Sequence, residues 1–257
     1  LYGGLLCIKS FSKALKDHRQ LPYRKMNTIN LLPKGKPVFP EYELALKEPD
    51  GLLAAGGLLN VEWLKEAYTK GIFPWFNSDD EEILWWCPSE RAILYPGEMH
   101  VSRSLKKVLK RNLFHIAYDH DFKGVLENCS RRNDSSEGTW ITESMKKAYN
   151  EMYIAGLAHS VEVTLEGELV GGVYGISLGS MFFGESMFSR VDNASKVALY
   201  YLQQKLYEWS FTLIDCQIMN PHLQSLGAVT IARAEFIDLL QSNNKKQTKA
   251  GSWATTI

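Results

Sequence analysis

The chain has 257 residues, 45% of them hydrophobic, which is enough for one large domain or two smaller ones with a substantial core. Its 29 basic residues balance 29 acidic residues, which argues against a protein that coats nucleic acid over its whole surface but allows a local basic patch. No apolar run approaches the roughly 18 residues of a membrane span.

The start of the chain lacks the order of a signal peptide, because basic residues are scattered behind a short apolar segment. Met26 is a candidate initiator. We therefore expect residues 1–25 to be an upstream or poorly ordered extension. A small α+β domain is expected over 26–97, a larger α+β domain over 98–240, and a polar, frayed tail over 241–257.

The segment "NVEWLKEAYTKG", residues 60–71, predicts a short helix with Asn60 as its N-cap and Gly71 at its end. Three apolar or aromatic residues share one face of this helix: Leu64, Ala67 and Tyr68. "ILWWCP" and "AILYPG" follow and predict strands.

A basic helix is predicted over residues 102–111, with Ser102 as its cap. Its charged side holds Arg103, Lys106, Lys107, Lys110 and Arg111. One interpretation is a solvated helix face. The other is a surface that contacts phosphates, which positions a nucleic acid without recognising its sequence.

Two amphipathic helices are predicted over 121–130 and 142–156, and then the hydrophobic period changes from helical to alternating. The alternating stretch from His159 to Ser189 predicts three antiparallel strands, with turns near Glu166-Gly167 and Leu178-Gly179. Residues 192–209 predict a further helix that crosses back to the sheet.

"FTLIDCQIMN", residues 211–220, predicts a buried strand that contains two polar residues, Asp215 and Gln217. Alternation places both on one face, and places Ile214, Cys216 and Ile218 on the other. A buried carboxylate or amide needs a partner. Together with Glu185 in "FFGESMFS", these side chains predict a cleft with two carboxylates, which would attract a cationic group and supply a candidate general base.

Trp75 and Trp140 each lie in a loop that contains Gly or Pro. A loop tryptophan can be a hydrophobic plug, or it can stack on an unpaired base with a gain of about 1–3 kcal/mol. Both interpretations remain open on the sequence.

The four cysteines are widely spaced, never as C-x-x-C, and the six histidines show no metal-ligand spacing. We expect reduced thiols, no metal, no cofactor and a cytoplasmic protein. His159 and His222 are better explained as structural residues.

Several segments together resemble one family, leucyl/phenylalanyl-tRNA–protein transferase. They are "GIFPWF", "LWWCPSERAIL", "SRSLKK", "EGTWIT", "AHSVEV", "LVGGVYGISLGSMFFGESMFSR", "NASKVAL", "LIDCQIMN" and "SLGA", and they occur in order over roughly residues 38–240. The resemblance implies a larger domain with the GCN5-related N-acetyltransferase fold. It also implies transfer of Leu or Phe, and also Met, from aminoacyl-tRNA to proteins that begin with Arg or Lys, which marks them for N-end-rule degradation. We expect a monomer.

The resemblance also implies roles by position. Asp215, Gln217 and Glu185 match the catalytic motifs, and Trp75 and Trp140 match the tryptophans that hold the 3′-terminal adenosine. The pocket for the donor side chain would be lined by Phe182, Leu199 and Ile214. The five basic residues of helix 102–111 would meet the acceptor stem. One departure is Ile231-Ala232-Arg233, where the family often has Ile-Pro-Arg.

The chemistry that we expect needs no covalent intermediate, because an aminoacyl ester is already activated. The attacking α-amine has an ordinary pKa near 7.7–8.0, so the enzyme must keep it neutral and hold it about 3 Å from the carbonyl. We expect Asp215 to orient Gln217 by a hydrogen bond and to help remove the proton, while the Gln217 oxygen holds the amine.

Two other functions compete with this one. An acetyl-CoA-dependent N-acetyltransferase would need a Gly-rich pyrophosphate turn, and "FSRVDNASK" lacks it. A non-enzymatic RNA-binding adaptor would use the basic helix and the tryptophans, but it leaves Glu185, Asp215 and Gln217 without a role.

Overall fold

The computed structural model describes residues 29–131 and 141–256. The expected extension over residues 1–25 and the candidate Trp140 lie outside the described residues. The helices are η2 (Tyr42–Leu44), α2 (Val61–Thr69), α3 (Arg103–Arg111), α4 (Phe122–Ser130), α5 (Glu143–Ile154), α6 (Ala194–Glu208), α7 (Pro221–Ser225) and α8 (Arg233–Asn243). The strands are β1 (Asn30–Leu32), β2 (Leu52–Gly56), β3 (Phe73–Pro74), β4 (Leu84–Trp86), β5 (Glu90–Leu94), β6 (His115–Tyr118), β7 (Ala158–Leu165), β8 (Glu168–Leu178), β9 (Met181–Ser189), β10 (Leu213–Asp215), β11 (Val229–Ala232) and β12 (Thr255–Thr256).

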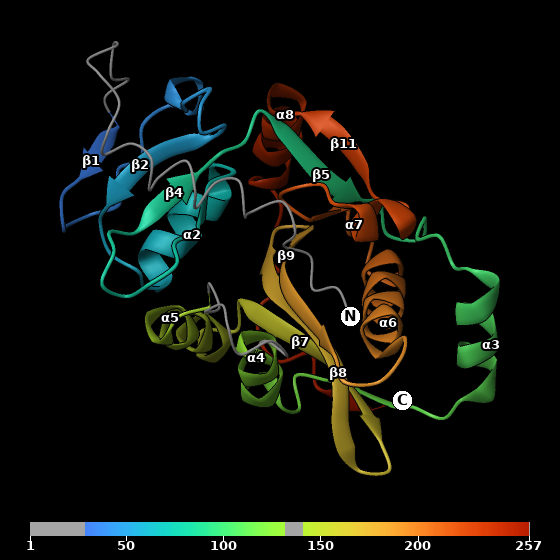
Figure 1. The fold of residues 1–257 in the computed structure, drawn as a ribbon. Helices are drawn as coiled ribbons and strands as arrows, with labels where there is room; N and C mark the ends of the chain where they lie inside the picture. The colour runs from blue at the N-terminus through green and yellow to red at the C-terminus, as the bar shows by residue number, and fades with distance from the viewer. Residues whose placement is uncertain (1–28, 132–140, 257) are drawn as a thin grey trace.

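The strands form two sheets (Figure 1). The smaller has the order β1-β2-β4-β3, and the larger has the order β11-β5-β10-β9-β8-β7-β6-β12. The larger sheet contains the predicted three-strand meander β7-β8-β9, followed by α6, which returns the chain to place β10 parallel to β9. The expected α+β class is confirmed.

Side-chain caps explain where the predicted helices begin. Asn60, Ser102 and Thr142 each accept a hydrogen bond from the backbone N–H three residues later, at the starts of α2, α3 and α5. Each cap satisfies an N–H group that the helix itself leaves without a partner. Tyr68 and Tyr149 lie on the buried faces of α2 and α5.

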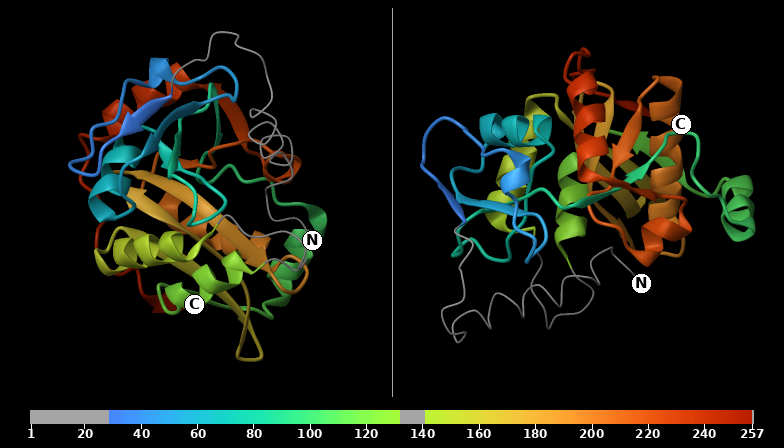
Figure 2. Two further views of the ribbon diagram at one scale, coloured as in Figure 1. Left: turned by 60° about the vertical axis from the view of Figure 1, so that its left-hand side comes forward. Right: turned by 90° about the horizontal axis from the view of Figure 1, so that it is seen from above.

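The large sheet has helices on both faces (Figures 1 and 2). On one face, α4 and α5 pack with α2 in a core that includes Tyr149, Tyr174 and Phe183. On the other face, α6 covers a second core that includes Phe182 and Ile214. Because side chains alternate along a strand, neighbouring residues of β9 belong to different cores.

The change from one sheet to the other lies between Trp86 and Glu90. The predicted boundary at residue 97 would assign β5 to the small domain, but β5 pairs with β10 and β11 in the large sheet. The N-terminal segment also shares a hydrophobic core with the large sheet. The boundary therefore lies earlier than predicted, and the two sheets share packing.

The expectation of a frayed tail is wrong. Trp253 is 4% exposed and stacks on His159 with ring centroids 3.7 Å apart. The Trp253 backbone N–H donates to Asp119, and β12 pairs with β6 at the edge of the large sheet. The polar composition misled the prediction, because one tryptophan and a few backbone hydrogen bonds hold this segment.

None of the helices in residues 29–131 and 141–256 combines the length and apolar character that a membrane crossing requires.

Candidate active site

Glu185 occupies a β-bulge in β9. The register pairs Gly175 with Gly184 and Tyr174 with Ser186, so Glu185 has no residue opposite it on β8. A bulge locally breaks the alternation and redirects a side chain. The Glu185 carboxyl consequently reaches Tyr68 and Tyr149, which project from α2 and α5 on the face that carries Phe183.

The Glu185 carboxyl is held by neutral donors. The Tyr68 hydroxyl donates to Oε1 and the Tyr149 hydroxyl donates to Oε2, each at 2.6 Å. Burial raises the pKa of Glu185 to about 7, although the two tyrosines lower it; the Asp215 charge raises it and the Arg91 charge lowers it. The carboxyl therefore exists in both protonation states near neutral pH.

Asp215 has a different environment, because Arg91 binds both of its oxygens. The Arg91 Nε–Oδ1 distance is 2.8 Å and the Nη2–Oδ2 distance is 2.7 Å, and both side chains are buried. Arg91 also donates to the Gly71 carbonyl and lies over the rings of Phe73 and Phe236. Desolvation alone would lower the pKa of Arg91, but Asp215 raises it overall, so the guanidinium stays charged.

Gln217 connects the two carboxylates. Its backbone N–H donates to Asp215 Oδ1 at 2.9 Å, and its side-chain Nε2 donates to Glu185 Oε1 at 3.4 Å. The predicted strand over 211–220 is wrong beyond Asp215, since β10 ends there and Gln217 is left-handed with φ 55°. Ile218 is 41% exposed and does not anchor the strand in the core. Backbone geometry, not alternation, brings Gln217 to Glu185.

The expected hydrogen bond between Asp215 and Gln217 is present, but it runs through the Gln217 backbone and not through its side chain. Because Arg91 occupies both Asp215 oxygens, the proton-accepting role expected of Asp215 does not fit this geometry. Glu185 is the carboxyl at the site with a pKa near neutrality.

The three residues predicted to line the donor pocket lie together on the α6 face. Phe182 pairs with Ile214 in the β9–β10 register, and Leu199 projects from α6 into the same core. Each is at most 4% exposed. They form a packed layer on the face opposite Glu185, so a donor side chain would have to open this layer to enter it.

Trp75 is 9% exposed and packs against Trp86, with ring centroids 5.4 Å apart. Its Nε1 is buried and has no hydrogen-bond partner within the described residues. A buried N–H without a partner is unusual, and the Trp75 N–H can still donate a hydrogen bond to a bound ligand.

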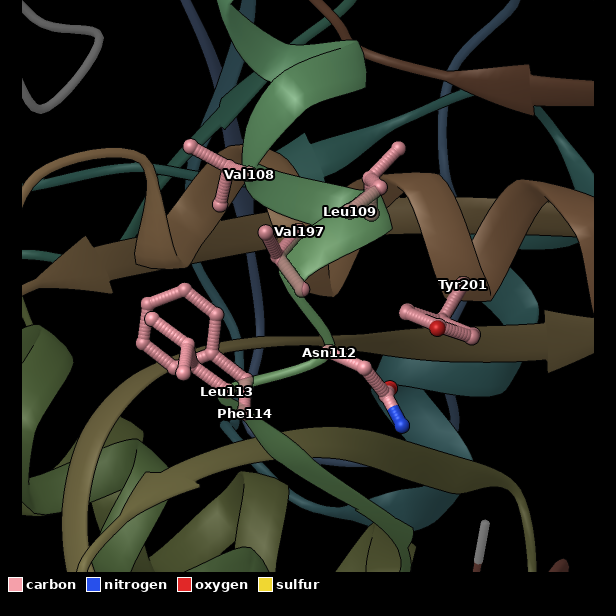
Figure 3. Close-up of a pocket in the computed structure, with 7 residues that line it drawn as sticks. All are labelled: Val108, Leu109, Asn112, Leu113, Phe114, Val197 and Tyr201. Atoms are coloured by element: carbon pink, nitrogen blue, oxygen red, sulfur yellow. The ribbon is translucent and has the colours of Figure 1, made fainter.

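All five basic residues of α3 are exposed, and the helix lies at the periphery, away from the small sheet (Figures 1 and 2). Leu105 is its buried contact. A shallow apolar notch separates the end of α3 from α6 (Figure 3). Its lining is Val108, Leu109, Asn112, Leu113, Phe114, Val197 and Tyr201.

The sequence reasoning missed Tyr68, Tyr149 and Arg91. Both tyrosines fit the apolar faces of their helices, and nothing in the pattern indicates that their hydroxyls meet a carboxylate. Arg91 had a usable signal, because it shares a strand face with the buried Ile93. A buried arginine requires an acidic partner, and Asp215 was available.

No three His, Cys, Asp or Glu side chains in the described residues come together in a way that could hold a metal ion.

Two family models match the chain. The model described as leucyl/phenylalanyl-tRNA protein transferase matches residues 93–241, and the model of the N-terminal domain of that transferase matches residues 57–89. Curated proteins with the name leucyl/phenylalanyl-tRNA–protein transferase are similar over most of the chain. The Pseudomonas putida protein is 50% identical over 88% of this chain and 99% of its own length. The Azotobacter vinelandii protein is 53% identical over 79% of this chain and 89% of its own length.

Among solved structures, a GCN5-related N-acetyltransferase from Kribbella flavida aligns with a TM-score of 0.37 and 13% identity, covering 64% of this chain and 58% of its own. The L-PGS structure from Bacillus licheniformis aligns with a TM-score of 0.36 and 12% identity, covering 66% and 54%.

Proposed function

Because the chain belongs to the leucyl/phenylalanyl-tRNA–protein transferase family, which transfers an aminoacyl group from tRNA to protein, we propose that Glu185 and Gln217 form the centre where the acceptor α-amine attacks the ester. The observation that carries this proposal is a partly buried carboxyl with a pKa of about 7 beside a side-chain amide. This pKa lies close to that of an α-amine, so proton transfer between the two groups is nearly balanced.

Glu185 takes the proton of the acceptor. The ionised carboxylate accepts one proton from the α-ammonium group, which leaves a neutral amine. The amine nitrogen then forms a bond to the ester carbonyl carbon and the bond to the tRNA 3′-oxygen breaks. That oxygen leaves as a hydroxyl with the second proton, which the nitrogen loses as it becomes an amide, and Glu185 releases the first proton to solvent before the next turnover. One amide and one free tRNA end result, with no covalent enzyme intermediate.

Gln217 holds the amine. Its Nε2 already donates to Glu185, which leaves the side-chain oxygen as the acceptor for an amine N–H. The left-handed backbone at Gln217 and its N–H bond to Asp215 fix this orientation. Arg91 and Asp215 are positioning residues in this scheme, since they act through Gln217.

The aminoacyl end of the donor tRNA enters where β9 and β10 separate. Their register ends at Phe183 and Asp215, after which β9 bulges and the chain beyond β10 turns away. A carbonyl placed at this point has the Glu185 face on one side and the layer of Phe182, Leu199 and Ile214 on the other. The apolar layer takes Leu, Phe or Met, with Trp75 and Trp140 at the 3′-adenosine and the basic residues of α3 at the acceptor stem.

The acceptor is a protein with N-terminal Arg or Lys. Asp215 is neutralised by Arg91, while Glu185 has no ion-pair partner within the described residues, so a cationic N-terminus finds its negative charge at Glu185. The enzyme works as a monomer in the cytoplasm, and its product is a substrate for N-end-rule degradation.

Single-turnover transfer of labelled Leu from tRNA to an Arg-initiated peptide tests the centre. Glu185→Gln should lower the rate about 10²–10⁴-fold, the usual contribution of a general base, with tRNA affinity unchanged. Gln217→Ala should also lower the rate more than the affinity. Full activity in Glu185→Gln would refute the proposal. Parallel reactions with acetyl-CoA, and RNA binding alone, separate this function from acetyl transfer and from an RNA adaptor.

The preference of the enzyme among aminoacyl-tRNA donors gives a second measurement. Phe182→Ala should reduce discrimination against Ile-tRNA, because one methylene in an apolar pocket contributes about 1–3 kcal/mol. Unchanged discrimination would remove Phe182 from the donor pocket without affecting the assignment of Glu185.

A further inference from the structure

Three oxygen-bearing groups from three elements close a triangle at the bulge of β9. The Tyr68 hydroxyl lies 2.6 Å from Glu185 Oε1, the Tyr149 hydroxyl lies 2.6 Å from Oε2, and the two hydroxyl oxygens lie 2.9 Å apart. Both tyrosines are fully buried. All three distances are within the range for O–H···O hydrogen bonds.

The number of protons in this triangle depends on the charge of Glu185. When Glu185 is ionised, only two phenolic protons are available for the three oxygen–oxygen contacts, and both are donated to the carboxylate. The two hydroxyl oxygens then face each other without a proton between them. With Glu185 protonated, three protons serve three contacts, and each group donates once and accepts once.

We propose that Tyr68 and Tyr149 are positioning residues that hold the Glu185 carboxyl in both of its charge states, by two donated hydrogen bonds when it is ionised and by a ring of three hydrogen bonds after it takes the proton of the acceptor amine. This inference rests on the proposed function of Glu185. The proton bonds to one Glu185 oxygen and is donated to a phenol oxygen, that phenol donates to the second phenol, and the second phenol donates to the other carboxyl oxygen. The oxygens need not move, so the only reorganisation that accompanies the transfer is the rotation of one phenol O–H from the carboxylate to the other phenol.

The phenols serve as hydroxyls and not as bases. Burial raises the pKa of Tyr68 and of Tyr149 well above the ordinary value, and the Glu185 charge raises both further. They therefore keep their protons over the working pH range and act only as hydrogen-bond donors and acceptors.

The other groups around Glu185 are few. Tyr174 of β8 is buried, its pKa is raised by burial and by Glu185, and its hydroxyl has no partner within the described residues. Asp215 of β10 and Arg91 of β5 act on Glu185 with opposite signs. The Gln217 amide is the remaining donor. Because the Asp215–Arg91 pair is internally neutral, the tyrosines are the principal groups that adjust the proton affinity of Glu185.

The pH profile of transfer tests this role. A hydrogen bond donated to a carboxylate favours its ionised form, so removing one raises the pKa. Tyr68→Phe and Tyr149→Phe should each move the acid limb of the kcat/KM profile upward by about one pH unit, and the double variant should move it further. The rate at pH 6.5 should fall about tenfold for each single variant, whereas the variant and wild-type profiles should converge at alkaline pH.

Tyr153→Phe is the matched control. Tyr153 lies on the same helix as Tyr149, but its hydroxyl donates to the Asp119 carbonyl, so its loss should leave the acid limb in place. Site-specific 3-fluorotyrosine at position 68 or 149 should shift the limb downward, because a more acidic phenol donates more strongly. This second substitution keeps the hydroxyl and does not depend on the stability of the Phe variants.

A uniform loss of rate at every pH in the double variant, with the acid limb unmoved and no response to fluorotyrosine, would overturn the inference and leave the tyrosines as packing residues. The proposed function fails separately if the wild-type acid limb persists in Glu185→Gln, since that limb would then belong to another group.

Discussion

Two regions of the large sheet each bury a carboxyl group, and they satisfy it in different ways. Asp119, near the end of β6, accepts the backbone N–H groups of Ser160 at 2.9 Å and Trp253 at 2.7 Å, with the His159 ring nitrogen at 2.8 Å. Glu185 is held by two tyrosine hydroxyls. A backbone N–H can only donate, whereas a hydroxyl can donate and accept. The first region therefore anchors the tail through backbone groups that only donate, whereas the second contains hydroxyls that can also accept a hydrogen bond.

A third buried acid sharpens this comparison and should give the largest effect on stability. Arg91→Met leaves the Asp215 charge buried without compensation, so the free energy of unfolding should fall by about 3–5 kcal/mol. Urea denaturation measures this loss. The double variant Arg91→Met/Asp215→Leu should recover most of the stability but not the transfer rate, since Gln217 loses its anchor. Recovery of both would show that the ion pair serves the fold alone.

The pH dependence of stability should show the contrast directly. The folded-state pKa of Glu185 is raised to about 7. The contribution of Glu185 to the free energy of unfolding is therefore fully present below its unfolded pKa near 4.5 and is lost as the pH rises through 7. The expected loss is about 2–3 kcal/mol, allowing for partial exposure, because one pKa unit corresponds to about 1.4 kcal/mol. Wild type and Glu185→Gln are compared by urea denaturation between pH 4.5 and 8. Parallel curves would contradict the raised pKa.

The Asp119 region should give a smaller effect, confined to stability. Asp119→Asn replaces one acceptor oxygen with a donor and leaves a buried N–H without a partner, which should cost about 1–2 kcal/mol. The transfer rate at saturating substrate and its acid limb should not change. A shift of that limb would mean that the two regions are coupled and would break the comparison.

The smallest effect is expected in α3, which belongs to neither region. Lys106→Ala should weaken aminoacyl-tRNA binding a few-fold and reduce the slope of log K against log salt by about one. Lys65→Ala on α2 is the control, because its side chain is exposed on a helix remote from α3 in the fold. Equal salt slopes for wild type and Lys106→Ala would exclude a phosphate contact at this lysine.

Local rules predicted much of the fold. Asn60, Ser102 and Thr142 cap the predicted helices, and the turn at Glu166-Gly167 lies between β7 and β8. These features depend on neighbours within a few residues, so the sequence contains their causes. The tail was mispredicted because its partners, His159 and Asp119, are about a hundred residues away in the chain.

The candidate site could be predicted only in part from the sequence, for the same reason. Asp215, Gln217 and Glu185 were conspicuous as polar residues within apolar segments. The position of Arg91 on an apolar strand face signalled the need for an acidic partner, but the sequence did not show that Arg91 would bind both oxygens of Asp215, or that a bulge would turn Glu185 towards two tyrosines. Those facts depend on the register between distant strands and on the packing of α2 and α5 against them.

The pairing of β12 with β6 has a consequence for solubility. Thr255 and Thr256 align with Tyr118 and Ala117, so the tail covers the outer strand of the large sheet. An uncovered strand presents a row of free N–H and C=O groups that another chain can extend into an aggregate. A chain that lacked its last residues would keep every group of the proposed centre, yet β6 would become an edge strand that another chain could pair with.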